Sequence, residues 1–168
     1  MSKPPRDLAV TQSRTFFLTI NSWSGHSLFQ VHRLCDLFLS TLQNYREQGR
    51  FQLHEFVLMP NHVHLLLSPG EDMTLERTVQ LIKGGFSFRA AREGDFRGEV
   101  WQRGYVDHRV RDPRDYLFHR EYIRQNPVRA RLVVSPAEYK FSSANPIYIL
   151  EAVPQGLKPN LDPAQRHD

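Results

Sequence analysis

Residues 56–68 read FVLMPNHVHLLLS, and this stretch decides the fold. Two apolar runs flank the pair Pro60-Asn61, and this arrangement is typical of a tight turn between two strands. The stretch therefore predicts a hairpin. Because successive side chains of a strand point to opposite faces of a sheet, His62 and His64 share one face. The other face, which can pack under helices, receives Val63, Leu65 and Leu67.

Periodicity on either side of the hairpin predicts the remaining elements of the sheet and its covering helices. Aromatic and β-branched residues predict strands at 14–20, 51–59, 62–68 and 101–110. Apolar residues at helical spacing predict a helix over 28–48 and a second that begins after Thr74, its N-cap. Gly84 and Gly85 are unfavourable inside this second helix and indicate a kink or a close approach of its backbone to a ligand.

A third helix follows the sheet. Asp112 is a good N-cap and Pro113 suits the first helical position. We expect the helix to end near Gln125 or Asn126, since the residue before Pro127 avoids helical geometry. The order β-α-β-β-α-β plus a helix predicts an α+β fold, namely a ferredoxin-like split βαβ antiparallel sheet with an added C-terminal helix.

Composition is compatible with one globular domain of ordinary polarity. The chain has 168 residues, 40% of them hydrophobic, one cysteine and a net charge of +4. We expect a flexible arm over 1–13, a domain over 14–150 and a flexible proline-rich tail over 151–168. With one cysteine, no secretory-type segment and no apolar run of about 20 residues, the expected setting is cytoplasmic and not membrane-bound.

The histidine pair, His62 and His64, is a candidate half-site for a divalent metal, because two imidazoles would project side by side. Two partly exposed surface histidines are the alternative. A third ligand could come from the third helix, where Asn126 and Gln125 offer amide oxygens suited to Mg²⁺ or Mn²⁺.

Tyr122 is a candidate nucleophile on the same helix. It lies four residues before Asn126, so both share one helix face. A tyrosine that attacks phosphorus forms a covalent phosphotyrosine and divides one difficult displacement into two easier ones. The alternative is an amphipathic residue that packs in the core with its hydroxyl at the surface. Tyr116 is a second candidate, but it has no amide partner four residues on.

Three segments together resemble a known family: MPNHVHLLL (59–67), VWQRGYVDHRVRDPRDY (100–116) and YIRQNPVRARLV (122–133). They are similar to the signatures of the single-tyrosine HUH transposases, in particular the branch associated with repetitive extragenic palindromes. The similarity extends over roughly residues 15–143.

The resemblance implies a function and roles for residues. His62 and His64 would be metal ligands and Tyr122 the nucleophile of an endonuclease that cleaves and rejoins single-stranded hairpin DNA through a 5′-phosphotyrosine. Mg²⁺ or Mn²⁺ would be the cofactor. In insertion-sequence relatives a glutamine four residues after the tyrosine is the third metal ligand. Here that position is Asn126, which would be the third ligand, with Gln125 as the reserve. A monomer and a homodimer with exchanged helices both remain open.

Basic residues are the candidate DNA contacts, although each could be an ordinary surface charge. The set is Lys83, Arg89, Arg92, Arg103, Arg109, Arg111, Arg129 and Arg131. His108 could support the site without binding the metal, and aromatic residues of 96–105 could stack on bases. Two other functions are compatible with the sequence: a non-catalytic module that binds nucleic-acid hairpins, and a metal-dependent hydrolase with water as nucleophile.

Overall fold

A single antiparallel sheet with helices on both faces forms the structure. The computed structural model describes residues 14–159. The strands are β1 (Phe16–Asn21), β2 (Phe51–Met59), β3 (His62–Pro69) and β4 (Val106–Arg109), and the helices are α2 (His32–Glu47), α3 (Leu75–Arg92) and α4 (Pro113–Arg129). Short 3-10 turns occur at Trp23–Gly25, Leu28–Gln30, Pro136–Glu138 and Gln155–Leu157. None of the helices in this range is both long and apolar enough to cross a membrane.

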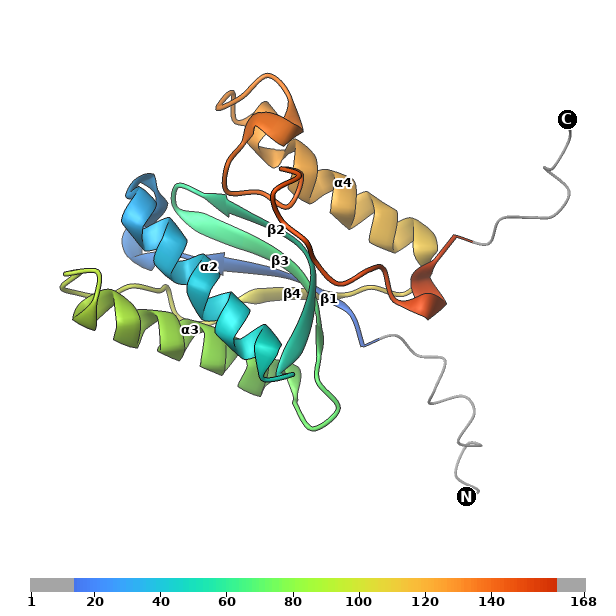
Figure 1. Cartoon of the computed structure of the whole chain (residues 1–168), viewed down its shortest axis with the longest axis horizontal. Coiled ribbons are helices and arrows are strands. Elements are labelled where there is room, and N and C mark those ends of the chain that lie inside the picture. The colour runs from blue at the N-terminus through green and yellow to red at the C-terminus, as the bar shows by residue number, and fades with distance from the viewer. Residues whose placement is uncertain (1–13, 160–168) are drawn as a thin grey trace, which may run out of the picture.

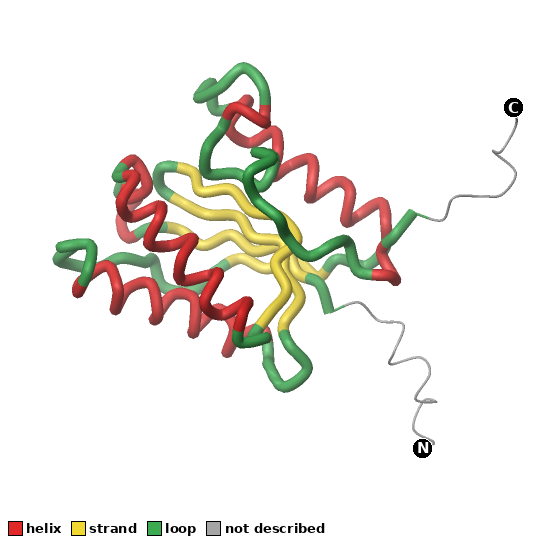
Figure 2. The backbone as a smooth tube through the Cα atoms, viewed as in Figure 1, coloured by secondary structure: helices red, strands yellow, loops and turns green. Residues whose placement is uncertain are grey.

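The strand order β2-β3-β1-β4, with every neighbouring pair antiparallel, confirms the predicted split βαβ sheet. Helices α2 and α3 cover one face and α4 lies alone on the other (Figure 1). The tube in Figure 2 shows the same layers, with the strands between α2 and α3 on one side and α4 on the other. The α+β class and the added C-terminal helix are therefore both confirmed.

The larger core lies between the sheet and α2 and α3. Val63, Leu65 and Leu67 are fully buried in it, as the alternation along β3 predicted. Helix α3 is continuous through Gly84 and Gly85, and the close approach there is to another helix rather than to a ligand. A Cβ on Gly85 would lie 2.2 Å from the hydroxyl of Tyr45 on α2, so glycine allows the two helices to approach.

A bulge in β2 sets which side chains reach the face under α4. Leu53 pairs with Leu67, but the next ladder pair is Glu55 with Leu66, so His54 is the extra residue. The His54 ring contacts the Ser68 hydroxyl and the backbone carbonyls of 151 and 152. Without the bulge Glu55 would face α2 and α3; with it, Glu55 faces α4.

Helix α4 packs on this second face through an apolar patch and a buried ion cluster. Tyr116 and Ile123 lie in a small core that also includes Val57 and Leu66. The carboxylate of Glu55, a residue that is 5% exposed, forms ion pairs with the guanidinium groups of two α4 arginines. These are Arg120 at 3.3 Å and Arg124 at 2.9 Å, and the hydroxyl of Ser143 also donates to the carboxylate.

Helix α4 ends at Arg129, and not before Pro127 as the sequence predicted. The N-terminal prediction is confirmed, since Asp112 Oδ1 accepts from the backbone N of Asp115 at 2.8 Å. At the other end the helix continues through the buried Pro127 to Arg129. A Schellman motif ends it instead: Leu132 N bonds Pro127 O, and Arg131 takes the left-handed conformation with φ 59°. Burial of the proline offsets its missing backbone donor.

The fourth strand is shorter than the predicted range 101–110. Only Val106–Arg109 pairs along β1, while Trp101 makes an isolated bridge with Ser22. The indole of Trp101 is buried in the larger core and donates to the Lys83 carbonyl at 3.1 Å. The aromatic side chain of Trp101 contributed to the strand prediction, but it is aromatic because it packs in the core.

The C-terminal segment also differs from the expected flexible tail over the part that the structure describes. Glu151 pairs with Arg46 and accepts from the backbone N of Leu53, and Leu157 is buried in the core under α4. Proline-rich composition did not reveal these anchors, because they depend on partners far away in sequence. The expected arm at 1–13 and the rest of the tail, 160–168, lie outside the described residues.

Glu55→Gln is predicted to destabilise the fold by about 2 kcal/mol, because two arginines lose the carboxylate that they share in a mostly buried setting. Urea unfolding followed by circular dichroism measures the loss. Glu71→Gln, at an exposed position, is the matched control and should change stability by less than about 0.5 kcal/mol. Equal stability of the Glu55 variant and the wild type would show that the ion cluster adds nothing to helix docking.

Candidate metal and nucleophile site

The two histidines lie on β3 and share one face, as the strand alternation predicted, and α4 packs on that face. The two ring centroids are 4.8 Å apart. His64 is 4% exposed and His62 is partly exposed, so the pair reaches from the buried face toward the solvent at the turn. The arrangement follows from the register, in which His64 lies opposite Thr19 of β1 and His62 opposite Asn21.

Each imidazole is held by one ring nitrogen and keeps the other available. Nδ1 of His62 lies 2.7 Å from the side-chain oxygen of Asn61, which can only accept, so this nitrogen carries the proton. Nδ1 of His64 contacts the Thr19 hydroxyl at 3.0 Å. Nε2 of His64 is buried without a hydrogen-bond partner. A buried orphan nitrogen beside a second imidazole fits a divalent metal, because a metal replaces the missing partner.

Burial also keeps both imidazoles of the histidine pair neutral, which is the form that binds a metal. Burial, with a smaller effect from the neighbouring His62, lowers the pKa of His64 from 6.5 to about 3. The pKa of His62 is lowered as well, again by burial. Both imidazoles are therefore neutral near pH 7, and neutral imidazole is the metal-binding form.

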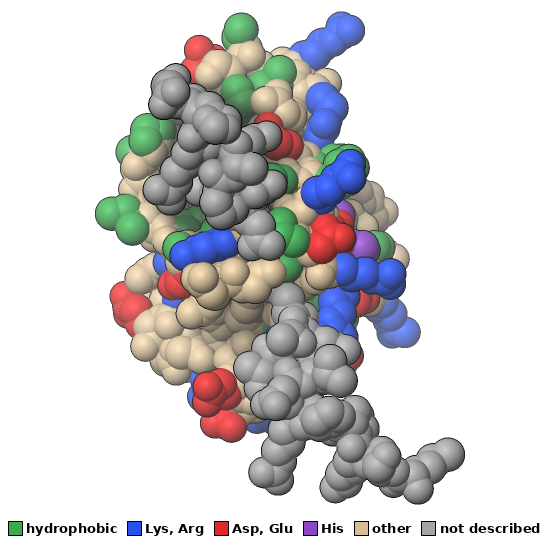
Figure 3. All heavy atoms as spheres, turned by 90° about the vertical axis from the view of Figure 1, so that its right-hand side faces the viewer, with side chains coloured by type: hydrophobic (Ala, Val, Ile, Leu, Met, Phe, Trp, Pro, Cys, Tyr) green, Lys and Arg blue, Asp and Glu red, His purple; other side chains and the backbone are tan. Residues whose placement is uncertain are grey.

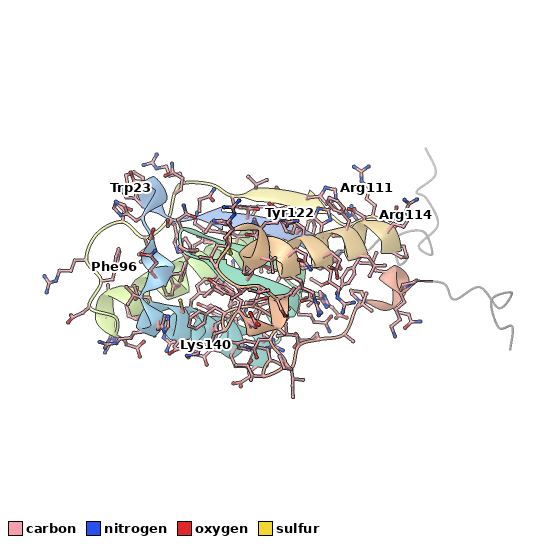
Figure 4. The ribbon with its side chains drawn as sticks, turned by 90° about the horizontal axis from the view of Figure 1, so that it is seen from above. Trp23, Phe96, Arg111, Arg114, Tyr122 and Lys140 are labelled. Carbon is pink, nitrogen blue, oxygen red and sulfur yellow. The ribbon has the colours of Figure 1, made fainter. Side chains whose placement is uncertain are left out.

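Tyr122 joins this pair from α4 of the same chain. Its ring centroid lies 5.4 Å from that of His64 in an edge-on contact. Phe17 of β1 lies beside both, 5.2 Å from His64 and 5.7 Å from Tyr122. Figure 4, viewed from above, shows Tyr122 between α4 and the strands. Tyr122 is 37% exposed, so a large substrate can reach this side chain.

The two candidate third ligands leave α4 in different directions. Residues on an α-helix are separated by about 100°, which places position 126 about 40° from Tyr122 toward the buried Ile123. Position 125 lies about 60° away on the opposite side. Gln125 accordingly lies away from the buried side of α4, in an exposed groove that Phe118, Tyr122 and Arg129 also line. Asn126 is the candidate on the side that faces the sheet.

The other aromatic candidate, Tyr116, is placed apart from the histidine pair. It is 3% exposed, and its ring contacts His54 at 6.3 Å. Burial raises its pKa to about 12. This tyrosine packs in the core beneath α4, whereas Tyr122 borders the histidines.

The candidate DNA-contacting residues divide into two groups. Lys83 donates to the carbonyls of Gln102 and Gly104, both at 2.9 Å, and Arg89 binds Ser40, Thr41 and Glu93. These two side chains hold the fold together. The guanidinium of Arg129 lies 4.6 Å above the ring of Tyr122 and donates to its carbonyl at 2.8 Å. The exposed members are Arg92, Arg103, Arg109, Arg111, Arg129 and Arg131.

Several neighbours of the site were not identified from the sequence. Asn61 and Thr19 orient the histidines, and Phe17 fills the space between β1 and α4. The signal for Asn61 was present, since it directly precedes the pair in the turn. Thr19 and Phe17 come from the first strand, and only strand pairing brings them to this face. His108 lies further along the same face and binds Asp115 rather than the histidine pair.

Comparison with known proteins gives the class of this one. The family described as "Transposase IS200 like" matches residues 25–126, more than half of the chain. The chain therefore belongs to the IS200-like transposase family, whose match includes the histidine pair and Tyr122.

Several individual proteins are similar to this chain. The REP-associated tyrosine transposase of Escherichia coli K12 is 26% identical over 131 residues, 77% of this chain and 75% of the relative. An uncharacterized protein of Haemophilus influenzae is 28% identical over 130 residues, 62% of this chain and 72% of that protein. A solved structure described as a REP-associated tyrosine transposase bound to a REP hairpin has a TM-score of 0.68 at 21% identity. It covers 89% of this chain and 90% of its own, which confirms the fold.

Acid should destabilise the protein because His64 is neutral when folded. Its pKa is about 3 in the folded chain. The unfolded value is near 6.5, so below about pH 6.5 the unfolded state binds more protons and stability falls as the pH falls. The slope from this residue approaches about 1.4 kcal/mol per pH unit.

Urea unfolding with a chelator at about pH 7.5 and about pH 5.5 measures this dependence. His64→Gln should lose about 1 kcal/mol less than the wild type between the two pH values. His26→Gln, at an exposed position, is the control and should keep the wild-type dependence. A His64 variant with the full dependence would contradict the assignment.

Proposed function

We propose that this transposase is a metal-dependent endonuclease that cleaves and rejoins single-stranded hairpin DNA through a 5′-phosphotyrosine. The observation that carries the proposal is the meeting of Tyr122 with His64, whose buried Nε2 has no partner. Family membership supports the transposase role, and the geometry supports this particular chemistry.

The histidine pair and an amide oxygen of α4 would hold Mg²⁺ or Mn²⁺. His62 and His64 each offer Nε2, since Asn61 and Thr19 engage their Nδ1 atoms. Asn126 is the third ligand that we propose, because position 126 turns toward the buried Ile123 and position 125 turns away from it. A bound dication would polarise the scissile phosphate and stabilise the charge that develops on it.

Tyr122 would supply the nucleophile. Its phenolic oxygen attacks the phosphorus, the bond from phosphorus to the 3′-oxygen breaks, and the phenolic proton is transferred, directly or through water, to that leaving oxygen. The products are a 5′-phosphotyrosine and a free 3′-hydroxyl. Attack of a 3′-hydroxyl on the phosphotyrosine reverses the step and rejoins a strand. Arg129, above the Tyr122 ring, places a positive charge beside the reacting groups.

A single chain brings the histidine pair and the tyrosine together. The contact between His64 and Tyr122 lies within one chain, between β3 and α4. We infer that a monomer can complete the site, so exchange of α4 between two subunits is not required. The exposed arginines near α4 would bind DNA phosphates, while Lys83 and Arg89 would contribute only by stabilising the fold.

Tyr122→Phe should abolish covalent capture of DNA. Wild type and variant are incubated with Mn²⁺ and a pool of labelled single-stranded hairpins, and a denaturing gel reveals protein-linked DNA. The wild type should give a protease-sensitive band that a chelator prevents. Tyr116→Phe is the matched control, because Tyr116 lies on the same helix but is buried away from the histidines. It should keep the band.

Other outcomes of this experiment identify the alternatives. Nicked DNA without an adduct in both wild type and Tyr122→Phe would indicate water as the nucleophile. Binding on a native gel with neither nick nor adduct, across many hairpins, would indicate a non-catalytic binding module. An adduct that persists in Tyr122→Phe would assign the nucleophile to another residue. Each of these results contradicts the proposal.

The third ligand is tested by comparing the two amides of α4. Asn126→Ala should weaken Mn²⁺ binding by roughly 10- to 100-fold, because a ligand facing the histidine pair is lost. Gln125→Ala should change it by less than about twofold, since position 125 turns away from the buried side of α4. Titration calorimetry on chelator-treated protein gives both affinities. The reverse order of effects would assign the role to Gln125.

A further inference from the structure

A second group of potential metal ligands lies at the junction of β4 and α4. We call it the β4–α4 cluster, and it consists of His108, Asp115 and His119. Nε2 of His108 is 2.7 Å from one carboxylate oxygen of Asp115, and Nδ1 of His119 is 3.0 Å from the other. The two imidazole rings stack with centroids 4.6 Å apart. One ligand atom from each residue lies within 4.8 Å of the other two.

The residue types and their placement suit a transition-metal dication. Two imidazoles with one carboxylate are a frequent ligand set for zinc and related ions. Asp115 and His119 are four residues apart on α4, so they project from one helix face. His108 adds a ligand from a different element. Such a set, drawn from a strand and a helix, can chelate an ion and join the two elements.

The cluster is accessible to an ion from solvent. The side-chain exposed fractions are 42% for His108, 20% for Asp115 and 13% for His119. In Figure 3 histidine atoms lie at the surface next to an acidic side chain, among basic ones. Arg111 and Arg114 lie near the start of α4, and their side chains extend outward in Figure 4. Solvent around these outward-pointing guanidinium groups reduces their repulsion of a bound cation.

The cluster is separate from the histidine pair. Phe17 lies between them, with its ring centroid 5.2 Å from His64 and 4.7 Å from His119. The phenyl ring offers no ligand, so one ion cannot be shared through it. The two groups therefore form neighbouring but distinct positions on the same face of the sheet.

We propose that His108, Asp115 and His119 form a second divalent-metal site, specific for zinc-class transition ions, that fastens α4 to β4. The site does not depend on the proposed cleavage chemistry. Its role is to stabilise the docked position of the helix that carries Tyr122. Mg²⁺ would bind it poorly, because imidazole nitrogens suit zinc better than they suit magnesium.

Zinc titration of the untagged, chelator-treated full chain tests the proposal. The variant that combines His62→Ala and His64→Ala removes the histidine pair and should still bind one Zn²⁺ per chain. Adding His108→Ala to that variant should weaken the remaining site at least about 100-fold, as expected when one of three protein ligands is lost. Adding His26→Ala instead, at an exposed loop position, should leave it unchanged. Calorimetry gives the stoichiometry and the affinity.

Two further measurements guard against misfolding and against failure of the catalytic proposal. Co²⁺ should give visible absorption bands of nitrogen-ligated cobalt in the His62, His64 variant, and His119→Ala should remove them. Zinc should raise the Tm of that variant but not after His108→Ala. No Zn²⁺ binding by the His62, His64 variant, or binding that survives both His108→Ala and His119→Ala, would overturn the proposal. Absence of a DNA adduct in the wild type would leave these zinc results unaffected.

Discussion

The docking of α4 on the face of the sheet opposite α2 and α3 is the constraint on which the site depends. An apolar contact and an ion cluster act together there. Ile123 is fully buried, while Glu55 holds Arg120 and Arg124 from the same helix. Hydrophobic burial alone would not fix the rotation of α4 about its axis. The buried carboxylate of Glu55 does so, because its ion pairs with two guanidinium groups require a defined geometry. The rotation of α4 about its axis decides whether Tyr122 faces the histidines.

The bulge in β2 makes this docking possible. One extra residue, His54, changes the register so that Glu55 points toward α4 instead of the larger core. The bulge is itself anchored, because the His54 ring contacts the Ser68 hydroxyl and backbone carbonyls of the C-terminal segment. That segment, which had been expected to be flexible, therefore contributes indirectly to the placement of Tyr122. A local irregularity of the strand and a distant part of the chain support the same contact.

The face under α4 combines polar groups that need different surroundings. His64 is buried and neutral, with one nitrogen held by Thr19 and the other unpaired. Tyr122 lies at the margin, where solvent and substrate can reach it. Phe17 separates this pair from the β4–α4 cluster. A single aromatic side chain thus lies between two groups on one sheet face, namely the histidine pair beside Tyr122 and the β4–α4 cluster.

Much of the fold was predictable because its signals are local. The alternation in β3 and the turn at Pro60-Asn61 predict the hairpin, and the Asp112-Pro113 cap fixes the start of α4. The end of α4 was predicted wrongly, since a Schellman motif and burial of Pro127 outweigh the local preference of proline to stop a helix. The length of β4 was also wrong, because core packing of Trp101 gives the same aromatic signal as a strand.

The sequence by itself determined the element order, the shared face of His62 and His64, and the family signatures. These properties depend on spacing along the chain, which periodicity reveals. The tertiary structure was needed to show that Tyr122 meets His64 while Tyr116 is buried elsewhere, and that Ile123 is on the buried side of α4. It also brought together the β4–α4 cluster. The physical reason is that these contacts depend on the rotation and docking of α4, which distant residues such as Glu55 control.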